Sequence, residues 1–158
     1  MGRKKSKIQK WTSRSVGIIY FALCSQNLIS SPIDHHQERF EDVALKIWEY
    51  AELGYLEEKS SSLLQQELKA SGFTIQSGVA GIPTAFIAEY NNGGPVLGIL
   101  GEFDALPGLS QQNVPFKTAE GLSSANGHAC GHHLFGAASA WAVVAIKEWL
   151  EESGTPGT

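Results

Sequence analysis

The chain has 158 residues, enough for one domain of ordinary size but not for two large ones. Hydrophobic residues make up 42% of it and 17 positions are glycine, which excludes a disordered or a fibrous protein. Six of the twelve basic residues lie in the first 14 positions, so the rest of the chain carries six basic residues against all sixteen acidic ones. This acidic body offers no basic surface to a phosphate backbone, and we expect no nucleic-acid partner.

The first thirty residues predict a secretory signal rather than part of the fold. A basic stretch over residues 1–14 precedes the apolar run 16–24, and polar residues follow it. This order is typical of a signal peptide (1–30) that is cleaved near residues 22–25. The apolar run has about half of the roughly 20 residues that a membrane-spanning helix needs. We therefore expect a secreted or periplasmic protein without a stable membrane span, the alternative being an uncleaved anchor or a basic tail.

Residues 31–158 are expected to form the folded part, beginning with two amphipathic helices. A first helix is predicted from about Asp34, its N-cap, by apolar residues at helical spacing: Phe40, Val43, Ala44, Ile47 and Trp48. After a break over residues 48–56, a second helix that ends at Gly72 is predicted by another apolar set: Leu63, Leu64, Leu68 and Ala70.

Three strand-like runs follow, over residues 73–76, 84–90 and 95–103. The Asn-Asn-Gly-Gly sequence at 91–94 is a strong signal for a hairpin between the second run and the third. Residues 96–100 are continuously apolar, which is typical of a central strand buried on both faces.

A long helix over residues 134–152 is predicted after a polar loop over residues 108–127. Its small residues at 136–138 and 140 would let it lie close against a sheet. Helices, strands and then a helix on a sheet form the start of an α/β domain, which is the expected fold class. The turn-forming residues 153–158 normally lead to another strand, so we expect the chain to be truncated before its sheet is complete.

The densest group of potential metal ligands is Gly-His-Ala-Cys-Gly-His-His, residues 127–133. Thiolate and imidazole are preferred ligands of zinc and similar divalent ions. Gly131 permits backbone angles that let Cys130 and His132 point at one ion. If the signal is removed together with Cys24, Cys130 is the only cysteine left, and a metal or burial must protect it. A structural zinc finger is disfavoured, because no second Cys or His pair has the required spacing.

Two carboxylates, Glu102 and Asp104, lie in the sequence Gly-Glu-Phe-Asp-Ala-Leu-Pro at the carboxyl end of the apolar run. Ligand-binding and catalytic groups of α/β sheets gather at such strand ends. The two carboxylates could bind a metal directly or accept the second N–H of a ligating histidine. Solvated loop acids without a function are the alternative.

Together, residues 101–111 and 127–133 resemble the aminoacylase and carboxypeptidase family of two-metal hydrolases. Within it they are similar to the branch of plant indole-acetyl-amino-acid hydrolases and bacterial aminobenzoyl-glutamate hydrolase, and residues 48–58 resemble the family's early helix–break–helix segment. The resemblance extends over roughly residues 40–150. It implies the amino-terminal part of a two-metal peptidase catalytic domain, a mixed sheet flanked by helices, whose remainder and dimerisation domain lie beyond the chain.

The resemblance implies two divalent metal ions, zinc or manganese, bridged by Cys130, with His132 bound to one of them. Asp104 would stand behind the metals and orient a ligand. The role of Glu102 stays open, because related carboxypeptidases place a ligating histidine there. His128 would be structural, and His133, where the family motif most often has Asp or Asn, could alter the surroundings of the metals or point outward. The general base and the other ligands would lie beyond the chain, which alone would be inactive.

The complete protein is thus expected to be a metal-dependent amidohydrolase that cleaves the amide bond of N-acyl or aryl-amide amino acids or small peptides, such as aminobenzoyl-glutamate. Its partners would be the small substrate and further copies of itself in a homo-oligomer. One alternative is a non-catalytic metal-binding module that uses the Cys130/His132 cluster and tolerates loss of Asp104. Another is a thiol enzyme with Cys130 as nucleophile and His128 or His132 as base, which leaves both carboxylates without a role.

Overall fold

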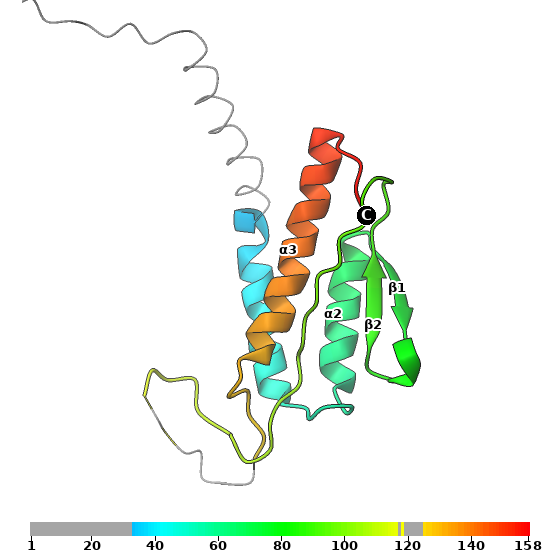
Figure 1. Cartoon of the computed structure of the whole chain (residues 1–158). Helices are drawn as coiled ribbons and strands as arrows, with labels where there is room; N and C mark the ends of the chain where they lie inside the picture. The colour runs from blue at the N-terminus through cyan, green and yellow to red at the C-terminus, as the bar shows by residue number, and fades with distance from the viewer. Residues whose placement is uncertain (1–32, 117, 119–124) are drawn as a thin grey trace, which may run out of the picture.

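The computed structural model describes residues 33–116, 118 and 125–158; the expected signal peptide and part of the polar loop lie outside this range. The elements in chain order are an amino-terminal helix (33–50), α2 (Glu58–Ala70), β1 (Thr74–Ser77), a short 3-10 turn η1 (Val79–Gly81), β2 (Phe86–Glu89) and α3 (His132–Ser153). Figure 1 shows the amino-terminal helix beside α3, with α2 next to them and the two strands at the edge. Within the described residues, no helix has the length and apolar character to cross a membrane.

The amino-terminal helix supplies much of the hydrophobic core. Phe40, Val43 and Ile47 recur at helical spacing and are 2%, 1% and 0% exposed. Phe40 stacks on Trp141 of α3 with ring centroids 6.2 Å apart. The predicted helix is confirmed, although Asp34, the expected N-cap, already lies within it.

The second predicted helix is confirmed as α2. Its N-cap residue, Glu57, makes no side-chain capping bond. The carboxylate of Glu52 instead accepts hydrogen bonds from two backbone N–H groups in the first turn, at 3.0 and 2.8 Å. A negative charge there also interacts favourably with the helix dipole. Leu64 and Leu68 bury the inner face of α2 in the core.

β1 and β2 form a two-stranded antiparallel sheet in which Thr74 lies opposite Glu89. They correspond to the first two predicted strands. The hairpin predicted at residues 91–94 is wrong: Gly93 and Gly94 do adopt left-handed φ angles of 72° and 75°, but among the described residues β2 pairs with the preceding strand, not with the following one.

Residues 95–103 run between α2 and α3 without forming a described strand (Figure 1). Val96, Leu97 and Leu100 are 78%, 73% and 73% exposed, so the prediction of a strand buried on both faces is wrong for this chain. Such burial requires flanking strands and a helical layer on each face. The described residues cover this segment incompletely, and its apolar side chains therefore remain open to solvent.

The last residue of the chain begins a parallel pairing with this segment. The N–H of Thr158 donates to the carbonyl of Pro95 at 3.0 Å, and its carbonyl accepts from the N–H of Leu97 at 2.8 Å. Bonds from one residue to positions two apart on its neighbour are the parallel pattern, here joined through α3 as in a βαβ unit. Helices and a small sheet thus fit the α/β class, whereas a larger mixed sheet is not found in the described residues.

α3 lies close against residues 101–103, as its small residues predict. A Cβ on Gly136 would stand 2.8 Å from the carbonyl oxygen of Glu102 and 3.1 Å from the Cβ of Phe103. Ser139 of the same helix donates through its hydroxyl to the carbonyl of Leu100 at 2.9 Å. This close approach brings the first turn of α3 next to the carboxylates of the 101–107 motif.

Candidate metal centre

The backbone that follows Asp104 is held by two neighbouring loops. The N–H of Ala105 donates to the carbonyl of Glu52 at 2.7 Å. Leu106 and Gly127 exchange two backbone hydrogen bonds, each 2.9 Å long. The two sequence motifs are therefore joined directly through their backbones, and the end of the first one is fixed in position before any side-chain contact is considered.

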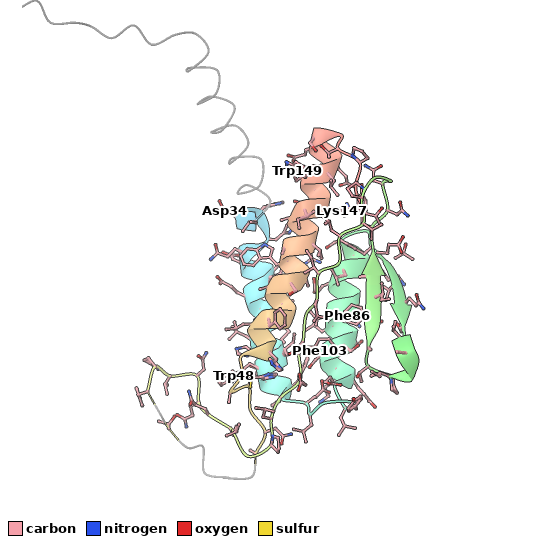
Figure 2. All side chains as sticks on the ribbon, in the orientation of Figure 1. Asp34, Trp48, Phe86, Phe103, Lys147 and Trp149 are labelled. Atoms are coloured by element: carbon pink, nitrogen blue, oxygen red, sulfur yellow. The ribbon has the colours of Figure 1, made fainter. Side chains whose placement is uncertain are left out.

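Alternation along this extended backbone sorts the side chains of the first motif. Glu102 and Asp104 lie on one face, and Phe103 lies on the other. The ring of Phe103 stacks on Phe86 of β2 with centroids 6.2 Å apart, and both are labelled in Figure 2. With Phe103 anchored in this way, the two carboxylates face the beginning of α3.

His132, the first residue of α3, lies between the two carboxylates. Its Nδ1 is 2.7 Å from Oδ1 of Asp104, and its Nε2 is 3.1 Å from Oε2 of Glu102. Ligand atoms of these three side chains all lie within 4.8 Å of one another. Gly131 precedes the helix with a left-handed φ of 77°, as the predicted role of this glycine requires. The side chain of Glu102 is 49% exposed, so the group opens to solvent on that side.

The hydrogen-bonding capacity of His132 limits what can lie between it and Glu102. A neutral imidazole has one N–H, and the shorter contact, to Asp104, places that proton on Nδ1. Nε2 then turns a lone pair toward the Glu102 carboxylate, which is unfavourable unless a proton or a cation lies between them. Two zinc ligands, each about 2.0–2.2 Å from the ion, stand about 3.0–3.6 Å apart. The 3.1 Å separation thus fits a divalent cation, with Asp104 orienting the histidine.

Cys130 lies on the exposed turn between His128 and His132 and forms no disulfide. The structure brings His132 and Asp104 together but does not include the Cys130 thiol in the same converging group. The roles of Cys130 and His132 as metal ligands, and of Asp104 as the residue that orients a ligand, stay predictions.

The other two histidines of the motif pack behind this group. His128 is 6% exposed, and its ring lies 5.0 Å from that of His133, which meets the edge of Trp48 at 5.2 Å (Figure 2 labels Trp48). Burial, with a smaller contribution from His128, lowers the pKa of His133 to about 4. Burial also lowers the pKa of His128, against smaller opposing effects of the Ile47 carbonyl and of Asp104. Both rings are therefore neutral at pH 7, and His133 packs inward rather than pointing outward.

Two features of the site were not identified from the sequence. The role of Glu102 was left open, although its alternation with Asp104 about Phe103 was a signal that both carboxylates share a face. The contact of His128 with Ile47 joins residues 81 positions apart, and no local pattern predicts it.

Several curated hydrolases are similar to this chain, although no family model matches it. The chain is 42% identical over 130 residues to a p-aminobenzoyl-glutamate hydrolase from Escherichia coli, a match that covers 82% of this chain and 27% of that protein. It is 30% identical over 106 residues to hippurate hydrolase of Campylobacter jejuni, covering 67% and 27%. It is 31% identical over 133 residues to Xaa-Arg dipeptidase of Homo sapiens, covering 75% and 26%. The chain thus spans about a quarter of the length of these relatives.

These relatives are hydrolases and peptidases that act on amide bonds, as the two motifs predict. Carboxypeptidases of Saccharolobus solfataricus, 34% and 36% identical over 90 residues, match as well. The resemblance drawn from residues 101–111 and 127–133 is therefore confirmed, and the chain belongs to the aminoacylase and carboxypeptidase family of hydrolases.

Proposed function

We propose that the protein is a metal-dependent amidohydrolase that cleaves the amide bond of N-acyl amino acids, with compounds like aminobenzoyl-glutamate as substrates. The observation that carries this proposal is His132 held between Asp104 and Glu102, an arrangement that suits a divalent cation. The names of two relatives, which give p-aminobenzoyl-glutamate and hippurate as the compounds they hydrolyse, support the substrate class.

Two divalent ions, zinc or manganese, are part of the proposal. His132 and Glu102 would hold one of them, and the thiolate of Cys130 would bridge to the second. Imidazole and thiolate suit zinc, while carboxylate oxygens also suit manganese. When bound, such ions polarise the amide carbonyl and bring the pKa of water toward neutrality.

The residues of this chain position the reacting groups rather than attack the substrate. Asp104 accepts the Nδ1 proton of His132, so that Nε2 stays aimed at the cation. Glu102 contributes negative charge, and its exposed side leaves an open approach for the substrate. The general base is proposed to lie outside the quarter of the relatives' length that this chain spans, and further copies of the protein to form a homo-oligomer.

The first test is hydrolysis of p-aminobenzoyl-glutamate by the product of the complete open reading frame. We expect a chelator to remove the activity and zinc or manganese to restore it. Asp104→Ala should lower kcat/KM by about 10–100-fold, because the ligating histidine loses its orienting partner. Asp34→Ala, at an exposed aspartate of the amino-terminal helix, is the matched control and should be unchanged.

Unchanged turnover in Asp104→Ala would contradict the role of this aspartate. Elemental analysis separates the function from a binding module. Two ions per chain in the complete protein, with few or none on the 158-residue chain, support the hydrolase. One tightly bound ion on the 158-residue chain, without hydrolysis by the complete protein, would indicate a metal-binding module instead.

Export is proposed from the sequence of residues 1–30. If this segment is a cleaved signal peptide, the protein reaches a secreted or periplasmic location and its mature form begins near residue 25. Amino-terminal sequencing of the purified protein checks this; a mature form that still carries Met1 would refute cleavage.

A further inference from the structure

We infer that His128 is a positioning residue of the candidate metal centre, which fastens the 127–133 motif to the end of the amino-terminal helix and thereby sets His132 relative to Asp104. The inference rests on the proposed function in one respect, because it requires a metal to bind at His132. His128 itself is not offered as a ligand.

The hydrogen bond of His128 joins the motif to the core. Its Nε2 is 3.0 Å from the carbonyl oxygen of Ile47. A carbonyl oxygen can only accept, so Nε2 carries the proton and the tautomer of the ring is fixed. Ile47 is 0% exposed, which makes it a rigid anchor. The motif is therefore attached to one of the most buried residues of the amino-terminal helix.

The backbone of His128 continues this support toward the metal group. Its carbonyl accepts the N–H of Gly131 at 3.0 Å, and this closes the turn from which His132 emerges. The ring also lies near enough to Asp104 to sense its charge. His128 thus stands between the helix end on one side and both members of the His132–Asp104 pair on the other.

A second contact reinforces the same attachment. The ring of His133 packs 5.0 Å from His128 and 5.2 Å from Trp48, the residue that follows Ile47. Two consecutive residues of the helix therefore hold two histidines on either side of the Cys130–Gly131–His132 turn. Displacement of the turn would require both contacts to break.

The chemistry of the imidazole distinguishes this role from simple filling of space. Within the described residues, the buried Nδ1 atoms of His128 and His133 have no hydrogen-bond partner. An unpaired buried nitrogen destabilises a fold, so an apolar side chain would fill the same space at lower cost. What the imidazole of His128 adds over such a side chain is its N–H to Ile47.

Cobalt(II) binding to the product of the complete open reading frame tests the inference. Cobalt(II) held by nitrogen and sulfur ligands absorbs visible light, and its titration gives an affinity. His128→Leu keeps the bulk but loses the N–H, whereas His128→Gln retains an N–H that reaches the Ile47 carbonyl. We expect Leu to weaken cobalt binding by about tenfold or more, and Gln by clearly less, as for residues that support ligands.

The matched control is His36→Gln. His36 makes a comparable 2.7 Å contact with Glu148 of α3, at the end of the amino-terminal helix that carries Asp34 in Figure 2 and opposite to Trp48. This variant should lose thermal stability without a change in the cobalt spectrum or affinity. A loss of affinity that follows thermal stability equally in all variants would show a merely structural role and overturn the inference.

Two further outcomes are decisive. If His128→Leu does not fold, His128→Asn replaces it, because its shorter amide does not reach Ile47; equal affinities of the Asn and Gln variants overturn the inference. If the wild-type protein binds cobalt and hydrolyses its substrate while His128→Leu binds cobalt equally well, the inference fails and the proposed function stands. If the wild-type protein binds no cobalt, both fail.

Discussion

His132→Ala in the product of the complete open reading frame is expected to remove metal from the candidate centre and to lower kcat/KM for p-aminobenzoyl-glutamate by about a thousandfold or more. The imidazole is the single nitrogen ligand of the Glu102–Asp104–His132 group, so the two remaining carboxylates lose the ligand that lies between them. Bound cations supply several kcal/mol of transition-state stabilisation, and each 1.4 kcal/mol is about a factor of ten in rate. Steady-state kinetics and elemental analysis of the same sample measure both effects.

His35→Ala is the control for this prediction. His35 lies exposed on the amino-terminal helix, so its replacement removes an imidazole without touching the metal group. Metal content and turnover should remain those of the wild-type protein. Full metal content together with full turnover in His132→Ala would refute the assignment of this residue.

Ile47→Ala is expected to lower the free energy of unfolding by about 2–5 kcal/mol, the range for removal of a large aliphatic side chain from a core. Ile47 is 0% exposed and packs in one cluster with Phe40, Leu64 and Val144. The substitution leaves a cavity where the amino-terminal helix, α2 and α3 meet, and neighbouring side chains fill it only in part. Chemical denaturation followed by circular dichroism gives the difference.

Leu45→Ala provides the comparison for this substitution. Leu45 lies two residues earlier on the same helix but is 49% exposed. Its replacement removes a side chain of the same size and should change the stability by no more than about 0.5 kcal/mol. Similar losses for the two variants would contradict the placement of Ile47 in the core.

The helices could be predicted from the sequence because their signal is local. Phe40, Val43 and Ile47 follow the helical period, and the small residues of α3 include Gly136, which meets the backbone of Glu102. The segment 95–103 was predicted wrongly for a physical reason. An apolar run shows that residues can be buried on two faces, but the strands and helices that would bury them are set by distant parts of a chain.

The candidate site was predictable in part for the same reason. Asp104 and His132 were identified because each lies in a short motif whose residue types suit metal chemistry. The open question about Glu102 depended on the direction of a side chain, which only the path of the backbone decides. The attachment of His128 to Ile47 depends on two segments far apart in sequence, and the predicted role of Cys130 stays untested.

Residues 96–100 also govern how the chain behaves at high concentration. An uncharged apolar run whose backbone is largely unpaired with described residues is a template for β-pairing between molecules. Thr158 occupies only its beginning. Self-association of the chain therefore depends on this short run, and a surface that covers it turns an aggregation-prone edge into part of a core.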